Sequence, residues 1–136
     1  MSPQLDDVVK NEGVLRVGTT VMGVADLRRA VEFWSRALEY VPKRPVADDD
    51  DFTILVPRSG EGAHLALDVS ETPVQDHPRI HLDLYAGDAA DQTSEIERLV
   101  ALGATRVDWD RYPPDPDFVV LADTEGNRFC VIDAGG

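Results

Sequence analysis

The alternation of apolar and polar positions divides the first half of the chain into strand-like and helix-like segments. A run rich in β-branched residues at 14–24 and two apolar runs at 53–56 and 64–69 predict strands. Between the first two runs, apolar residues recur at spacings of three and four over 27–38, directly behind Asp26. This spacing predicts an amphipathic helix that packs against the strands, with Asp26 as its N-cap.

The second half of the chain repeats this pattern. Residues 80–85 predict a strand, and the next apolar periodicity predicts a helix capped by Asp88 or Asp91 and ended by Gly103. The stretch 119–132 predicts a β-hairpin, because two apolar runs flank the turn-forming sequence D-T-E-G-N. We interpret each half as a strand, a helix and three strands.

The spacing of equivalent positions indicates an internal duplication. Thr19 and His81 lie on the first predicted strand of their respective halves, and Ala66 and Cys130 lie on the last. The first pair is separated by nearly the same number of residues as the second pair. Two similar modules are therefore expected in one chain.

The length of 136 residues suits one compact domain. We expect that domain to span 13–136, with a first module at about 14–70 and a second at about 79–134. Residues 1–12 mix acidic and polar side chains and are expected to form a polar N-terminal tail.

The composition limits which binding partners and which cellular compartment we expect. Acidic residues number 26 against 13 basic ones, so the net charge of −13 opposes binding to nucleic acid or to anionic membranes. No apolar run approaches the ~20 residues of a membrane span, and the N-terminus lacks a signal-peptide layout. A single cysteine agrees with a reducing compartment. These features predict a cytoplasmic protein without nucleic-acid or membrane partners.

Three segments resemble the vicinal oxygen chelate superfamily, which includes glyoxalase I and the bleomycin-resistance proteins. They are VADLRRAVEFWSRALEY at 24–40, RIHLDL at 79–84 and LADTEGNRFCVI at 121–132. The resemblance implies an α+β fold in which two βαβββ modules form a curved, eight-stranded mixed sheet around a cleft. It also implies a homodimer.

The same resemblance places the superfamily's four metal-ligand positions on Thr19, Ala66, His81 and Cys130. Glyoxalase I relatives use two histidines and two carboxylates there, and only His81 is a ligand of that kind. Cys130 stands where those relatives have glutamate. We therefore expect no metal and no other cofactor, while a zinc site built from His64, His81 and Cys130 remains an alternative.

Strand alternation extends the predicted lining of the cleft to every second residue around these positions. The candidate catalytic residues are His81, Asp83 and Cys130. The candidate ligand-binding residues are Thr19, His64, Asp68, Tyr85, Trp109 and Arg128. Structural alternatives remain open, because charged pairs can satisfy each other inside a sheet and a lone cysteine is often a small buried side chain.

Two functions follow from this set. The first is binding of a small organic molecule in the cleft without the usual metal. The second is a lyase, isomerase or hydrolase in which His81 acts with Asp83 or Cys130 in proton transfer, with or without a noncanonical metal. A cleft filled by the chain's own side chains would exclude both.

Overall fold

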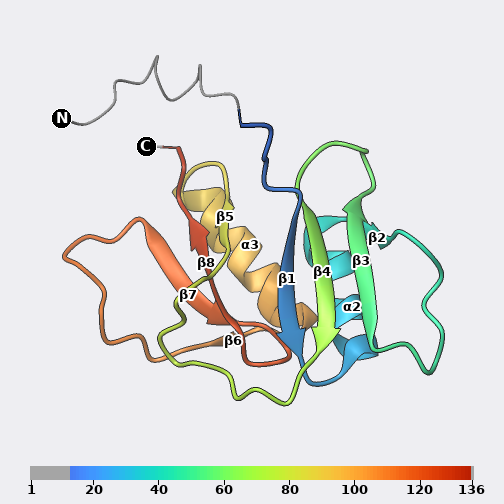
Figure 1. Ribbon diagram of the computed structural model, residues 1–136. Coiled ribbons are helices and arrows are strands. Elements are labelled where there is room, and N and C mark those ends of the chain that lie inside the picture. The colour runs from blue at the N-terminus through green and yellow to red at the C-terminus, as the bar shows by residue number, and fades with distance from the viewer. Residues whose placement is uncertain (1–12, 136) are drawn as a thin grey trace.

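A computed structural model describes residues 13–135 (Figure 1). The predicted α+β fold of two βαβββ modules is confirmed. The first module contains β1 (Thr19–Val24), α2 (Leu27–Leu38), β2 (Tyr40–Pro42), β3 (Phe52–Pro57) and β4 (His64–Val69). The second contains β5 (Asp83–Tyr85), α3 (Ala89–Leu102), β6 (Thr105–Arg106), β7 (Phe118–Ala122) and β8 (Arg128–Ile132).

Two strands are shorter than the sequence pattern predicts. Strand β1 begins at Thr19 rather than at Val14, because Val14, Leu15 and Val17 are almost fully exposed and have no neighbouring strand to pair with in the described part of the chain. Strand β5 likewise starts at Asp83. The predicted tail at 1–12 lies outside the described residues.

The eight strands hydrogen-bond as two four-stranded mixed sheets, one for each module. The first sheet has the order β1-β4-β3-β2, and the second has the order β5-β8-β7-β6. In both sheets the first strand of the module lies at one edge and pairs in parallel with the last strand of the module. The remaining pairs are antiparallel. This repeated topology is the internal duplication seen as structure.

One core joins the two modules. In Figure 1 both helices lie behind the sheets, where α2 contacts the first sheet, α3 contacts β8, and the helices contact each other. Trp34 is fully buried on α2, and its ring packs edge-on against Phe129 of β8 with the centroids 5.2 Å apart. The helices therefore cover one face of each sheet, and the opposite faces remain open.

Both helices begin and end as their sequences predict. Asp26 caps α2 by accepting a hydrogen bond from the backbone of Arg29. Asp88 and Asp91 form a capping box at α3, so each of the two predicted caps takes part. Gly103 ends α3 with φ near 125°, a conformation that favours glycine.

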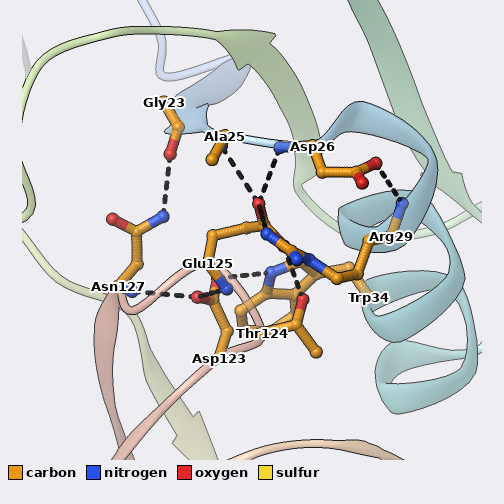
Figure 2. A network of polar contacts seen from close by, with 9 residues as sticks. All are labelled: Gly23, Ala25, Asp26, Arg29, Trp34, Asp123, Thr124, Glu125 and Asn127. Atoms are coloured by element: carbon orange, nitrogen blue, oxygen red, sulfur yellow. Dashed lines mark hydrogen bonds and ion pairs between the residues drawn. The ribbon is translucent and has the colours of Figure 1, made fainter.

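The turn of the β7–β8 hairpin is fastened to the start of α2, which belongs to the other module (Figure 2). The Glu125 carboxylate accepts hydrogen bonds from the backbone N–H groups of Ala25 at 3.0 Å and Asp26 at 2.8 Å. It also accepts two bonds from the Arg29 guanidinium and one from the Thr124 hydroxyl. The Glu125 side chain is 1% exposed, so its carboxylate is largely shielded from water.

Asp123 and Asn127 add further contacts between the modules (Figure 2). We call the set formed by Asp123, Glu125 and Asn127 with the start of α2 the clasp. Asp123 accepts a hydrogen bond from the indole N–H of Trp34 at 2.9 Å and holds the turn through the backbone N–H groups of Glu125 and Asn127. The Asn127 side chain donates to the carbonyl of Gly23 at 2.8 Å. The hairpin that carries Arg128 and Cys130 is thereby fixed to the first module.

The two carboxyl groups of the clasp have pKa shifts of opposite direction. Burial raises the pKa of Asp123, and its hydrogen bonds only partly offset that effect. Burial alone would also raise the pKa of Glu125, but the hydrogen bonds from Arg29, Asp26 and Thr124 together outweigh it and lower that pKa. Glu125 is therefore held as a carboxylate in the folded protein.

Neither helix of the described residues is long and apolar enough to cross a membrane.

Candidate functional site

A pocket of about 530 Å³ lies over the open face of the second sheet. Strands β5, β7 and β8 form its floor, and residues from the two loops before β5 and before β7 form its rim. The residues on the three floor strands that line it are Asp83, Tyr85, Phe118, Val120, Arg128, Phe129, Cys130 and Ile132. The volume suits a small organic molecule.

The strand register orders the floor by chemistry. Cys130 pairs with Asp83 on one side and with Val120 on the other. Two residues further along β8, Ile132 pairs with Tyr85 and with Phe118, and this row is apolar and aromatic. Two residues in the other direction, β8 places Arg128. The floor therefore runs from a polar end at Arg128 to an apolar end at Ile132.

His81, in the loop directly before β5, meets Asp83 and Cys130 at the polar part of the floor. The Nε2 atom of His81 lies 2.9 Å from Oδ1 of Asp83. One ligand atom from each of the three residues falls within 4.8 Å of the others. The structure thus brings together the three candidate catalytic residues predicted from the sequence.

The thiol of Cys130 is a poor nucleophile in this setting. Burial raises the pKa of Cys130 to about 11, and the neighbouring Asp83 carboxylate adds to the shift by its charge and by accepting the thiol's hydrogen bond. At neutral pH the group is a thiol rather than a thiolate, and the thiolate is the reactive form. Proton transfer by His81 and Asp83 therefore fits the geometry better than attack by Cys130.

Arg128 brings a guanidinium into the pocket from β8. Its side chain is 20% exposed and donates to the carbonyl of Gly126 at 2.9 Å. Its second partner is the carboxylate of Asp76 at 3.2 Å, and that side chain is 82% exposed. An ion pair with so exposed a partner is weakened by solvent. The guanidinium thus has donors to spare for a ligand.

The rim includes residues that the sequence analysis did not select. His77 lies 2.8 Å from the carboxylate of Asp110, and its ring packs on Trp109 with the centroids 4.9 Å apart. The hydrogen bond from His77 lowers the pKa of Asp110. Arg111 also lines the pocket, as does Trp109, which the sequence did predict. His77 and Arg111 could have been found from the sequence only through the clusters of charged and aromatic residues in the two loops of the rim.

Thr19, His64 and Asp68 lie elsewhere. Thr19 pairs with His64 across β1 and β4, and Asp68 lies four residues further along β4 on the same open face of the first sheet. None of the three lines the pocket. The sequence analysis placed these three residues in one cleft with His81 and Cys130, and that prediction is corrected. The alternation of side chains along a strand assigns a residue to one face of its own sheet, and the first and second modules form separate sheets.

A sequence profile of the Glyoxalase-like domain family matches residues 19–132, which is most of the chain. The chain belongs to this family. Curated proteins contain no significant match to it.

Solved structures with the glyoxalase-like fold resemble the chain at low sequence identity. A glyoxalase/bleomycin resistance protein/dioxygenase family enzyme from Burkholderia phytofirmans PsJN has 14% identity and a TM-score of 0.67, with 86% of this chain and 97% of that chain covered. The fosfomycin resistance protein FosX from Listeria monocytogenes has 12% identity and a TM-score of 0.63, with 90% and 92% covered. A possible glyoxalase from Bacillus cereus has 15% identity and a TM-score of 0.64, with 88% and 99% covered. At these identities the likeness establishes the fold.

The four positions that the resemblance equates with metal ligands fall on both sheets. Of the four positions, Thr19 and Ala66 offer no carboxylate or imidazole, and they lie on the first sheet, away from the pocket. Cys130 lies on the second sheet and His81 directly before its strand β5, where Asp83 is the third potential ligand. A mixed site of these three would replace the expected combination with His64, which the structure places on the other sheet.

Proposed function

We propose that this glyoxalase-like protein binds a small organic molecule in the pocket over its second sheet. The supporting observation is a pocket of about 530 Å³ in which His81, Asp83 and Arg128 converge on an otherwise largely apolar floor. Small-molecule sites combine apolar walls with a few polar groups that orient the ligand in this way. The ligand's contacts come from protein side chains, without the metal that the superfamily commonly uses.

Filling the pocket tests this proposal. Ile132 is half-buried in the floor, so Ile132→Trp should occupy the apolar end while leaving a residue that suits a strand. Val100→Trp on the exposed side of α3 is the matched control. Fragments that bind the native protein in ligand-observed NMR should lose affinity about tenfold or more in the first variant only. Unchanged binding in a folded Ile132→Trp variant, or a large fragment library without a single binder, would overturn the proposal.

The second candidate function is an enzyme that transfers a proton through His81 and Asp83. The specific observation in its favour is their 2.9 Å contact on the pocket floor, because a carboxylate can orient an imidazole as a general base. It would act as a lyase, isomerase or hydrolase. A panel of aldehydes, epoxides and diketones is the test. Turnover that His81→Ala abolishes without loss of ligand affinity would favour the enzyme, and absence of turnover in the native protein would favour the binder.

A metal-assisted form of the second candidate would use His81, Asp83 and Cys130, whose nitrogen, oxygen and sulfur atoms form a set that suits zinc. Binding would require loss of the thiol proton, so affinity should fall as the pH decreases. Cobalt(II) offers a readout independent of activity. A thiolate-to-cobalt absorption band that Cys130→Ser removes would support this form, and its absence at stoichiometric cobalt would leave the metal-free pocket.

We also propose a homodimer. The open face of the first sheet carries exposed apolar side chains, with Val21 at 58% and Phe52 at 44% exposure. A second copy could cover this face and bring Thr19, His64 and Asp68 toward a ligand. Sedimentation equilibrium should give twice the chain mass of 14.9 kDa, and Val21→Glu should shift the protein toward monomer. A native monomer at micromolar concentration would remove the dimer from the account.

A cytoplasmic location completes the proposal. It is supported by the single cysteine, which agrees with a reducing compartment. The net charge of −13 disfavours nucleic acid and anionic membranes as partners. Cell fractionation with a tagged full-length chain would test the location.

A further inference from the structure

We propose that the ligand of the second-sheet pocket is an organic anion with a flat, apolar body, such as an aromatic carboxylic acid. The inference rests on the proposed function and adds the chemical class of the ligand. Two properties of the pocket support it. The Arg128 guanidinium at one end has unused hydrogen-bond donors, and a row of aromatic and apolar residues lies at the other end.

The anionic group is assigned to the Arg128 end. Among residues 13–135 the Arg128 guanidinium makes two hydrogen bonds, to Gly126 and Asp76, and a guanidinium has five N–H donors. Arg128 lines the pocket, and solvent is partly excluded around its side chain, which is only 20% exposed. A ligand carboxylate there would form charge-assisted hydrogen bonds, and the planar fork suits both of its oxygens.

The carboxylate bonded to Arg128 is that of Asp76, which is 82% exposed, and the two carboxylates that line the pocket lie at other positions. Asp83 is already engaged by His81 and by the Cys130 thiol. Asp117 directly precedes Phe118, which pairs with Ile132 at the opposite end of the floor from Arg128. A cationic ligand group would therefore be favoured only at that opposite end. In a chain of net charge −13, the Arg128 end is a local site for an anion.

The flat body is assigned to the row formed by Tyr85, Ile132 and Phe118. Tyr85 is 77% exposed although its ring lines the pocket, so the ring has apolar surface available for a ligand. The rim adds the indole of Trp109. Aromatic side chains bind flat rings by stacking or edge contacts. Arg128 and Ile132 are four residues apart on one strand, which corresponds to roughly 13 Å. A one- or two-ring acid fits this span.

Four matched probes separate charge from shape. We would measure dissociation constants by isothermal titration calorimetry for 2-naphthoate, 2-naphthylmethanol, 2-naphthylmethylamine and cyclohexanecarboxylate. The first three share a ring system and differ in charge, while the fourth keeps the charge without a flat ring. The native protein should bind 2-naphthoate about tenfold or more tightly than either the alcohol or the amine. Replacing the flat ring by cyclohexane should also weaken binding.

Variants assign the preference to residues. Arg128→Gln should bring the affinity for 2-naphthoate down to that of the alcohol, and the alcohol's own affinity should change less than about threefold. Arg36→Gln, on the exposed face of α2, is the matched control and should change neither. Tyr85→Ala should weaken 2-naphthoate more than cyclohexanecarboxylate. If Arg128→Gln does not fold, a salt series on the native protein substitutes for it, because the preference for the anion should shrink as ionic strength rises.

The outcomes distinguish the two proposals. If the alcohol or the amine binds as tightly as 2-naphthoate, the ligand class is wrong and the small-molecule pocket stands. A preference for the acid that survives in folded Arg128→Gln, or that salt does not reduce, also overturns the assignment. If none of the probes binds, and the fragment screen likewise finds no binder, both proposals fail.

Discussion

The clasp at Glu125 should stabilise the chain more than any exposed ion pair. Glu125→Gln keeps the shape of the side chain but removes its charge and turns one acceptor atom into a donor. In the native protein Oε1 accepts from the backbone N–H groups of Ala25 and Asp26 and from Nη2 of Arg29, while Oε2 accepts from Nε of Arg29 and from the Thr124 hydroxyl. Glutamine keeps one oxygen, so its amide nitrogen must face one of these two sets of donors. The Glu125 side chain is 1% exposed, so water cannot readily replace the lost acceptor.

The expected cost is about 3 kcal/mol. A buried donor left without a partner costs roughly 1–3 kcal/mol, and breaking a buried ion pair costs roughly 3–5 kcal/mol. The lower part of that range applies, because the Arg29 side chain is 51% exposed and stays hydrated when its partner is lost. With an unfolding entropy of about 2.1 cal/mol/K per residue, the loss corresponds to a decrease in Tm of about 10 °C for this chain.

Chemical denaturation followed by tryptophan fluorescence is the assay, since Trp34 is buried beside the clasp. Glu97→Gln, on the exposed surface of α3, is the control and should stay within about 0.5 kcal/mol of the native protein. A Glu125→Gln variant that is equally close to the native stability would refute the idea that this carboxylate joins the modules.

The pH dependence gives a second test of the same residue. The pKa of Glu125 is lower in the folded state than in the unfolded state, so the unfolded state binds the proton more readily. The stabilisation by Glu125 is therefore complete above the unfolded pKa of about 4.3 and is lost as the pH falls toward the folded value. The stability difference between the native protein and Glu125→Gln should shrink in that window. A constant difference from pH 7 to pH 3 would contradict the assigned shift.

Three further predictions concern single residues. Because the pKa of Cys130 is raised to about 11, iodoacetamide at pH 8 should label the folded protein more than about a hundredfold slower than the unfolded chain, and equal rates would contradict the shift. Gly103→Ala should destabilise the fold by more than about 1 kcal/mol in urea denaturation. The reason is that φ is near 125° and a Cβ would lie 2.9 Å from the Thr124 methyl group. An unchanged stability would show that the end of α3 adapts to alanine. Asp88→Ala removes one half of a capping box and should cost about 1 kcal/mol in the same assay, and a cost near zero would show that water replaces the cap.

Local elements could be predicted from the sequence because their determinants lie close together in the chain. The spacing of apolar residues over 27–38 and the cap at Asp26 fix α2, and turn chemistry fixes the hairpin before Arg128. Alternation along β5 and β8 also placed Asp83 and Cys130 on one face.

Contacts between distant segments could not be predicted in the same way. Glu125 lies about a hundred positions from the helix start that it binds, and its sequence context indicates only a turn. Alternation places His64 on the open face of its sheet but does not state where that sheet lies relative to the pocket. His77 and Arg111 reach the rim from loops, whose conformations follow no period.

The most direct test of a small-molecule site over the second sheet is a map of amide chemical shifts during titration with 2-naphthoate. The account predicts that the largest shifts fall on β5, β7 and β8 and include Cys130 and Arg128. Shifts confined to the first sheet would contradict it, as would the absence of shifts at concentrations up to about 1 mM both for 2-naphthoate and for every member of the fragment library.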